Sequence, residues 1–331
     1  MHPVLTVDFL KELIRAYLIL TFVLTGVSIL RMYRVRRYAA DRKRGKNRIL
    51  KLVQAGRMLQ VPVYSAEEIR QNKKKAVVRL SVFRCDEDKM SKAVIICPGG
   101  GYAHLCTKDE GYPLAAALNE MGYTAFVLEY RAGLHCSAHA PMEDLAAAVK
   151  LIEGYADQLQ VDMEGYAIMG FSAGGNLCGM FGSREYGYAY YGVRKPGCII
   201  LGYPWTNVNH WLQHPYWNIW VGLFGMWLSE RGNIYMFGFG NHFKRKNRES
   251  LCVQNFITPE YPPVYMFAGG NDILVPSGAH TDVMEKALKA NGVPYLYEKF
   301  FAVPHGVGLG IRTGAEGWLL KAVDFWEQNV K

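Results

Sequence analysis

The sequence predicts an α/β fold, a mostly parallel sheet with helices on both faces. Short apolar segments alternate with longer segments of helical spacing from residue 93 to residue 300, and this alternation is typical of such sheets. The chain has 331 residues, half of them hydrophobic, which is enough to bury one sizeable core. We therefore expect one main domain, residues 52–331, preceded by an N-terminal extension, residues 1–51.

The elements follow from the local patterns in order. Residues 60–65 and 76–83 alternate as half-buried strands do, and they predict a first antiparallel pair. Apolar spacing predicts helices over 112–121 and 141–159, and the second of these opens with Pro141 and the acidic pair Glu143 and Asp144. The remaining strands are expected from nearly continuous apolar runs at residues 93–97, 123–130, 166–169, 197–202, 263–268 and 295–300.

An uncharged apolar segment near the N-terminus predicts a membrane anchor. Residues 16–30 carry no charge, but as a helix they would reach only about 22 Å, less than a hydrocarbon core of about 30 Å. Long basic side chains at Lys11, Arg15 and Arg31 can extend to the headgroups and close this gap. We therefore expect membrane association through residues 9–33.

The positive charge of the chain is concentrated directly after this segment. Residues 31–51 contain ten Lys or Arg against the single Asp41, so they carry the whole formal charge of +9. The rest of the chain is neutral, which argues against nucleic-acid binding. Basic residues favour the cytoplasmic side, so the main domain is expected in the cytoplasm. A secretory signal would instead place its charges before the apolar run.

Other interpretations of the extension stay open. The apolar segment could lie in the membrane interface, dock on the main domain, or be translated from a misassigned start, with Met58 as the true first residue. The seven cysteines show no spacing of metal ligands. They read as buried thiols of a reducing compartment, and no metal site is predicted.

The most informative motif is Gly170-Phe171-Ser172-Ala173-Gly174, which lies between a predicted strand and a predicted helix. A sharp strand-to-helix turn exposes the central hydroxyl, and small residues two positions away on either side allow the chains to pass. Ser172 is therefore the candidate nucleophile. A serine hydroxyl needs a base to remove its proton and an acid to orient that base.

Suitable partners occur downstream, in the order acid and then histidine. Asp272 follows the strand predicted at 263–268, and His305 lies in the loop after the last predicted strand. Taken singly, Asp272 could merely cap the following helix, and His305 could be an ordinary loop histidine. Their order relative to Ser172 favours a catalytic triad.

A glycine-rich loop provides candidate donors for an oxyanion hole. The strand over 93–97 runs into Pro98-Gly99-Gly100-Gly101-Tyr102, where residues without side chains let the main chain approach a substrate. We expect the backbone N–H groups of Gly100, Gly101 and Ala173 to stabilise the oxyanion. A simple tight turn or a phosphate cradle is the alternative, although no GK[ST] sequence follows.

These motifs together resemble the α/β-hydrolases of the esterase and lipase group, nearest to the acetyl-esterase and feruloyl-esterase-like carbohydrate esterases. The resemblance covers residues from about 75 to 330. It implies that Ser172, Asp272 and His305 form the triad and that no metal or organic cofactor is needed. Pro98 replaces the histidine of the common HGGG pattern, and Val307 departs from the usual HGFGL ending.

The segment from residue 203 to residue 247 breaks the strand and helix alternation. In this fold such an insertion usually forms a lid, and large flat side chains suit an acyl or sugar pocket. Many of them could equally form the lid's own core. The aromatic residues of this segment include Trp205, Trp211, Trp217, Trp220, Phe224 and Trp227.

Four further polar residues near the expected site are not assigned to the reaction. His104, His135 and His139 could approach the cleft, but they lack the spacing of metal ligands and are expected to be solvated or structural. Arg131 follows the strand over 123–130 and is expected to hold a loop through hydrogen bonds rather than to contact substrate.

We therefore predict a serine esterase that cleaves short-chain carboxylic esters through an acyl-enzyme, with acetylated carbohydrates as the substrate class that the resemblance implies. The triad alone does not distinguish sugar esters from lipid esters. An amidase such as an arylformamidase, or a peptidase, is the second enzymatic possibility. A membrane-tethered binding protein without activity is the third, and the oligomeric state stays open.

Overall fold

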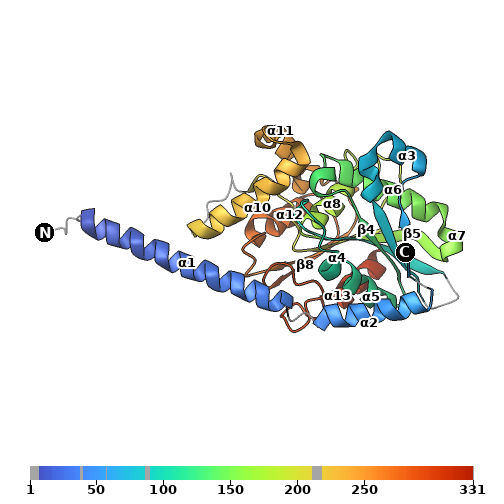
Figure 1. Ribbon diagram of the computed structural model, residues 1–331, viewed down its shortest axis with the longest axis horizontal. Coiled ribbons are helices and arrows are strands. Elements are labelled where there is room, and N and C mark those ends of the chain that lie inside the picture. The colour runs from blue at the N-terminus through green and yellow to red at the C-terminus, as the bar shows by residue number, and fades with distance from the viewer. Residues whose placement is uncertain (1–6, 38–39, 57, 86–89, 211–217, 331) are drawn as a thin grey trace.

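An eight-stranded sheet forms the centre of the molecule, in the order β1-β2-β4-β3-β5-β6-β7-β8 (Figure 1). The computed structural model describes residues 7–37, 40–56, 58–85, 90–210 and 218–330. The first two pairings, β1 with β2 and β2 with β4, are antiparallel, and the others are parallel. The strands are β1 (Met58–Pro62), β2 (Arg79–Phe83), β3 (Ser91–Cys97), β4 (Thr124–Glu129), β5 (Val161–Phe171), β6 (Cys198–Gly202), β7 (Val264–Gly269) and β8 (Tyr295–Phe300).

The parallel strands are buried on both faces, which explains their nearly continuous apolar sequences. In β6 and β7 every residue is buried. The parallel register aligns Ile96 with Met169 and Gly170 with Leu201. The carboxyl ends of β3, β5 and β6 therefore lie next to one another, and the loops that follow them meet at one edge of the sheet.

Helices cover both faces of the sheet, as the sequence predicts. On one face, α6 (Ala140–Gly154), α8 (Ala173–Phe181) and α12 (Thr281–Ala290) contribute to one hydrophobic cluster. On the other face, α5 (Tyr112–Glu120) and α13 (Trp318–Asn329) contribute to a second cluster. The helix predicted over 141–159 ends earlier than expected, at Gly154. The shorter helices are α3 (Ala66–Gln71), α4 (Thr107–Glu110), α7 (Ala156–Leu159) and α11 (Arg245–Glu249).

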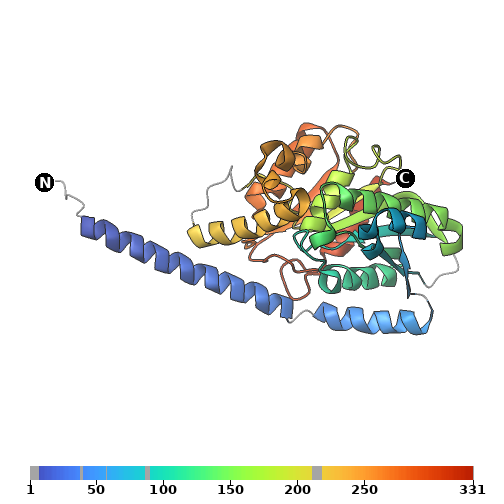
Figure 2. The same cartoon turned by 45° about the horizontal axis from the view of Figure 1, so that its top comes forward.

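The described residues of the N-terminal extension form α1 (Val7–Arg37) and most of α2 (Ala40–Gln54). Helix α1 projects away from the sheet, whereas α2 lies along the body (Figures 1 and 2). Within α1, Phe9–Tyr33 is long and apolar enough to cross a membrane. By length and composition this helix meets the requirements of either a membrane anchor or a signal sequence.

The basic stretch, residues 31–51, is shared between the two helices, because residues 31–37 end α1 and residues 40–51 belong to α2. Leu52 is 2 % exposed and joins the cluster that contains Leu118 of α5. Arg48 Nε donates to Asn119 Oδ1 at 3.2 Å. The apolar side chains on one side of α2 thus dock this helix on the body, which charge counting alone did not reveal.

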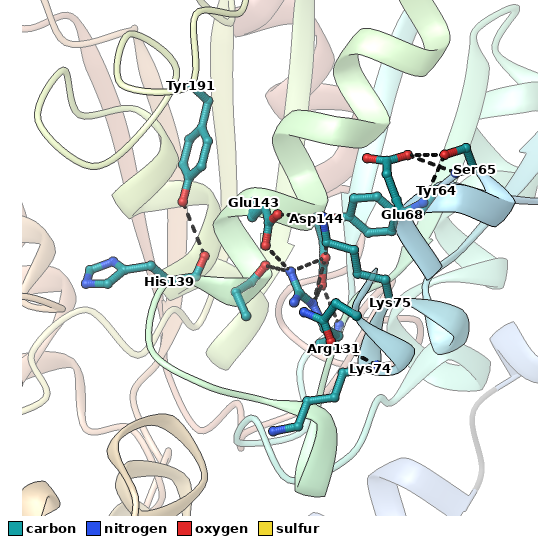
Figure 3. Close-up of polar contacts among 12 residues, drawn as sticks. Tyr64, Ser65, Glu68, Lys74, Lys75, Arg131, His139, Glu143, Asp144 and Tyr191 are labelled. Atoms are coloured by element: carbon teal, nitrogen blue, oxygen red, sulfur yellow. Dashed lines mark hydrogen bonds and ion pairs between the residues drawn. The ribbon is translucent and has the colours of Figure 1, made fainter. Parts of the chain in front are cut away.

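A buried ion pair fixes the loop that follows β4 (Figure 3). Arg131 is 3 % exposed, and its Nε donates to Asp144 Oδ1 at 2.9 Å. Asp144 also accepts from the backbone N–H of Arg131 and from the hydroxyl of Tyr64. Glu143, which bonds both Arg131 and Lys75, extends the network to the surface. Arg131 therefore holds a loop, as predicted.

Candidate active site

Ser172 lies in a strained turn between β5 and α8. Its φ of 51° and ψ of −116° fall in a region that residues with side chains seldom adopt. A Cβ on Gly170 would collide with the carbonyl oxygen of Gly174, and a Cβ on Gly174 would collide with that of Cys97. The two glycines are therefore required sterically, and the turn carries the Ser172 hydroxyl to the sheet edge.

The three predicted polar residues form one continuous hydrogen-bonded chain. His305 Nε2 lies 3.0 Å from Ser172 Oγ, and His305 Nδ1 lies 2.6 Å from Asp272 Oδ2. Asp272 and His305 are 6 % and 5 % exposed. Because a carboxylate accepts hydrogen bonds, Nδ1 is the protonated nitrogen, which leaves Nε2 to accept the Ser172 hydroxyl proton.

The position of Asp272 is set by the turn after β7. Its Oδ1 accepts from the backbone N–H groups of Leu274 and Val275, at 2.9 and 2.8 Å. The other oxygen is thereby turned toward His305. A Cβ on Gly269, at the end of β7, would collide with the carbonyl oxygen of Val303. This close approach brings the loop that carries His305 against the turn that carries Asp272.

The loop after β3 adjoins Ser172. Gly100 and Gly101 line the same cavity as Ser172 and His305. Gly100 has a φ of 131°, and a Cβ there would collide with the carbonyl oxygen of His104, so only glycine fits. Ala173 opens α8, where a backbone N–H has no partner within the helix. Among the described residues, no acceptor is found for the N–H groups of Gly100, Gly101 and Ala173.

Two residues that sequence reasoning missed connect the loops of the site. Glu110, 1 % exposed, accepts from the backbone N–H of Gly99 at 2.8 Å and from the hydroxyl of Tyr203 at 3.0 Å. The Tyr203 hydroxyl in turn accepts from the backbone N–H of Gly308 at 3.0 Å. The Tyr203 ring packs edge-on against His305, with ring centroids 4.8 Å apart. Glu110 and Tyr203 thus link the loop that follows β3 to the loop that carries His305.

A sequence signal for this pair was weak. Tyr203 follows β6 directly, at the same sheet edge as the predicted site, and this position was a usable indication. Glu110 ends the polar run Thr107–Glu110. Nothing in the sequence of such a run shows which of its carboxylates will be buried.

The insertion after β6 forms one wall of a cavity of about 180 Å³. It contains α10 (Ile219–Phe237) and α11. Of the aromatic residues expected to wall the pocket, Trp205 lines it. Trp220 instead donates from Nε1 to the carbonyl oxygen of Leu18 in α1, and Trp227 is 56 % exposed. Trp211, Trp217 and the Phe224 side chain lie outside the described residues. The insertion lines the cavity with Trp205, His210, Gly225, Ser229 and Arg231.

The other histidines occupy different positions. His104 lines the cavity. His139 stacks on Tyr186, with ring centroids 5.1 Å apart, and burial lowers its pKa. Within the described part of the chain, no group of three or more His, Cys, Asp or Glu side chains could hold a metal ion.

The sheet order, the strand-serine-helix turn and the acid and histidine loops at one sheet edge define the α/β-hydrolase class. Solved structures with similar folds include an acetyl ester-xyloside bifunctional hydrolase from Caldicellulosiruptor lactoaceticus, at 24 % identity and a TM-score of 0.64, over 82 % of this chain and 94 % of that one. A carboxylesterase from Lactobacillus plantarum matches at 19 % identity and a TM-score of 0.59, over 76 % and 92 % of the two chains.

Residues 82–288 match the BD-FAE family model. This range is well over half of the chain, and the chain therefore belongs to the BD-FAE family. His305 lies beyond the matched range.

Two curated proteins are similar in sequence. An acetylxylan esterase from Xylanibacter ruminicola is 25 % identical over 245 residues, which cover 74 % of this chain and 47 % of that protein. Endo-1,4-beta-xylanase B from Butyrivibrio fibrisolvens is 30 % identical over 137 residues, which cover 39 % and 21 % of the two proteins. The chain thus spans about half or less of the length of these relatives.

Proposed function

We propose that the protein is a carboxylic ester hydrolase that uses Ser172 as nucleophile and passes through an acyl-enzyme. The observation that carries the proposal is the chain of hydrogen bonds from Ser172 through His305 to Asp272, at 3.0 and 2.6 Å. These lengths match the reach over which a base takes a proton from a nucleophile. The acetylxylan esterase relative supports the same reaction class.

In the first half of the reaction, Ser172 Oγ attacks the ester carbonyl carbon while its proton moves to His305 Nε2. Asp272 holds the ring and stabilises the imidazolium. The carbonyl electrons move to the oxygen, which becomes negative. As that intermediate collapses, the bond to the alcohol oxygen breaks, and His305 returns its proton to the leaving alcohol. In the second half, His305 removes a proton from water while the water oxygen attacks the acyl carbon. The bond from that carbon to Ser172 Oγ then breaks, Oγ takes the proton from His305, and the acid is released.

The backbone N–H groups of Gly100, Gly101 and Ala173 are proposed to donate to the negative oxygen. Their support is that no described residue accepts a hydrogen bond from them, so they are available to a ligand. Removing one such donor typically costs about 2.7–4 kcal/mol of barrier.

The size and chemistry of the cavity favour short acyl groups. Its volume of about 180 Å³ is below the ~300–1,000 Å³ typical of pockets for drug-sized ligands. Ser229 lines the cavity, and its buried hydroxyl has no hydrogen-bond partner within the described ranges. A buried hydroxyl that has no partner in the protein can form a hydrogen bond with a polar group of the substrate. Together with the acetylxylan esterase relative, this favours acetyl esters of hydroxylated compounds, including carbohydrates.

The proposal is tested with Ser172→Ala beside the wild-type protein. We expect turnover of p-nitrophenyl acetate, acetylated sugars as further substrates, and loss of at least ~10³-fold in kcat in the variant. A fluorophosphonate probe should label the wild-type protein at Ser172 and leave the variant unlabelled. Turnover of only acyl anilides or N-formyl aromatic compounds would make the protein an amidase. Absence of both labelling and turnover would support a binding protein.

We further propose that residues 9–33 anchor the protein in a membrane, with the hydrolase domain on the cytoplasmic side. The support is the apolar helix Phe9–Tyr33 followed by the basic residues 31–51. A tagged full-length chain should appear in the membrane fraction and resist extraction by salt. Recovery of the chain wholly in the soluble fraction would contradict the anchor.

A further inference from the structure

Helices α1 and α10 are joined by polar contacts at one place. In both views, the N-terminal end of α10 lies beside the middle of α1 (Figures 1 and 2). Asn218 Nδ2 donates to Thr25 Oγ1 at 3.0 Å and to the carbonyl oxygen of Thr21 at 3.2 Å. Trp220 Nε1 donates to the carbonyl oxygen of Leu18 at 3.0 Å. Helix α10 is therefore tied to the segment that we propose as the membrane anchor.

The polar groups of this contact bond to one another. Thr21 and Thr25 donate to the carbonyl oxygens of Tyr17 and Thr21, each at 2.8 Å, and Asn218 is 4 % exposed. Polar side chains between helices in hydrocarbon must be satisfied in this way, because no water is available there. The contact is thus suited to a lipid environment.

The first half of α10 presents an apolar surface beside α1. No charged residue occurs from Asn218 to Ser229, and Glu230 and Arg231 follow directly. Four of the apolar side chains in this half are exposed by 42 to 56 %, namely Ile219, Leu223, Met226 and Trp227. Phe22 and Val23 of α1 are also exposed, and the Phe22 ring packs edge-on against Trp220 of α10, with ring centroids 5.5 Å apart.

On each helix, the first charged residue after the contact lies at a similar distance along the helix. From Thr21 to Arg31, α1 rises ten residues, or about 15 Å. From Asn218 to Glu230, α10 rises twelve residues, or about 18 Å. Half of a hydrocarbon core is also about 15 Å. If Phe9–Tyr33 spans a membrane, the contact lies near its centre, and on each helix the first charged residue after the contact lies about half a hydrocarbon core, or slightly more, along the helix from it.

From these observations we infer that the first half of α10 is inserted in the same bilayer leaflet as α1, with Asn218 near the membrane centre. The inference rests on the proposed anchor. The occupant of the apolar surface is a lipid bilayer, because the helix that is long enough to span one contacts α10 directly, at Asn218 and Trp220. The basic residues 31–51 follow at the membrane boundary, where they complement the anionic headgroups of a cytoplasmic leaflet.

Helix α10 also lines the cavity, through Gly225, Ser229 and Arg231. In the inferred placement, this wall of the cavity is therefore held close to the membrane surface.

The test measures tryptophan fluorescence of the full-length protein in vesicles of phosphatidylcholine and phosphatidylglycerol. The phosphatidylcholine is either unmodified or brominated near the middle of its acyl chains, because bromine quenches tryptophan on contact. The difference in emission between the wild-type protein and Trp227→Phe isolates the signal of Trp227. We expect bromination to reduce that signal at least twofold.

The matched control is Trp326→Phe, since Trp326 is fully buried in the hydrolase body. Its difference signal should be the same in both kinds of vesicle. Equal Trp227 emission with and without bromine would overturn the inference, whether α10 remains in water or is covered by a second copy of the chain. The protein must sediment with the vesicles in every arm, and failure to do so would overturn the anchor as well as the inference. Quenching in Ser172→Ala, or in a protein inactive on all esters, would support insertion independently of the proposed reaction.

Discussion

The buried carboxylate of Glu110 gives the sharpest prediction about the site, because its two oxygens accept from two different donors. One is the backbone N–H of Gly99 at 2.8 Å, and the other is the hydroxyl of Tyr203 at 3.0 Å. In Glu110→Gln only one side-chain oxygen remains. If that oxygen stays on the Gly99 N–H, the amide nitrogen faces the Tyr203 hydroxyl, which can accept from it but loses the carboxylate that accepted its own proton. One hydrogen bond to a charged oxygen is therefore lost.

The size of the effect follows from that lost hydrogen bond. A hydrogen bond to a charged group contributes about 1.5–3 kcal/mol. Gly99 directly precedes Gly100, and Tyr203 contacts the histidine loop, so either loss displaces a loop of the site. If the same free energy appears in the barrier, kcat falls by about 10- to 100-fold. KM should change by less than about threefold, because the displaced groups act mainly on the transition state.

The assay is steady-state hydrolysis of p-nitrophenyl acetate, with thermal unfolding measured on the same samples. Glu164→Gln is the matched control, because Glu164 is exposed on β5, away from the cavity-lining residues. It should leave both constants unchanged. A kcat for Glu110→Gln within twofold of the wild-type value, with the fold intact, would refute the positioning role. A raised KM at constant kcat would also refute it, and would assign Glu110 to substrate binding.

Three further changes test the structure at other places. Gly174→Ala should abolish fluorophosphonate labelling, because the added Cβ would collide with backbone carbonyl oxygens. The control Gly278→Ala should be labelled normally, since a Cβ there meets nothing within 4 Å. Equal labelling of the two variants would contradict the tight turn at Ser172. Asp144→Ala should lower the free energy of unfolding in urea by about 3–5 kcal/mol. The buried Arg131 then loses its buried partner and keeps only the part-exposed Glu143 as an ion pair, and a loss below about 1 kcal/mol would be inconsistent with that network. Burial raises the pKa of Cys136 to about 12, so at pH 8 only about one Cys136 thiol in 10⁴ is ionised. Iodoacetamide should therefore modify Cys136 only after unfolding. Fast modification of Cys136 in the folded protein would contradict its burial.

Local patterns were sufficient to predict most of the sheet. The apolar runs at residues 93–97 and 263–268 coincide closely with β3 and β7, because parallel strands buried on both faces leave a continuous signal. The turn at Ser172 was also readable, since its glycines are required by contacts within a short stretch of chain. The helix predicted over 141–159 was too long, because apolar spacing continues past the point where α6 ends.

Contacts between distant segments could not be predicted in the same way. The docking of α2 on α5 depends on Leu52 meeting a partner more than sixty residues away. The bond from Trp220 to Leu18 joins residues about two hundred positions apart. Neither contact leaves a periodic pattern in the sequence, because the residues on each side of it could pack against several other segments of the chain.

The sequence by itself determined the kind of fold, the candidate nucleophile and the order in which its acid and base follow, because strand burial and tight turns impose residue types locally. Only the tertiary structure decided that Glu110 and Tyr203 connect the loops of the site and that α10 lies against α1. The physical reason is that burial and pairing of a polar group depend on which surfaces meet, and that is settled when the whole chain packs.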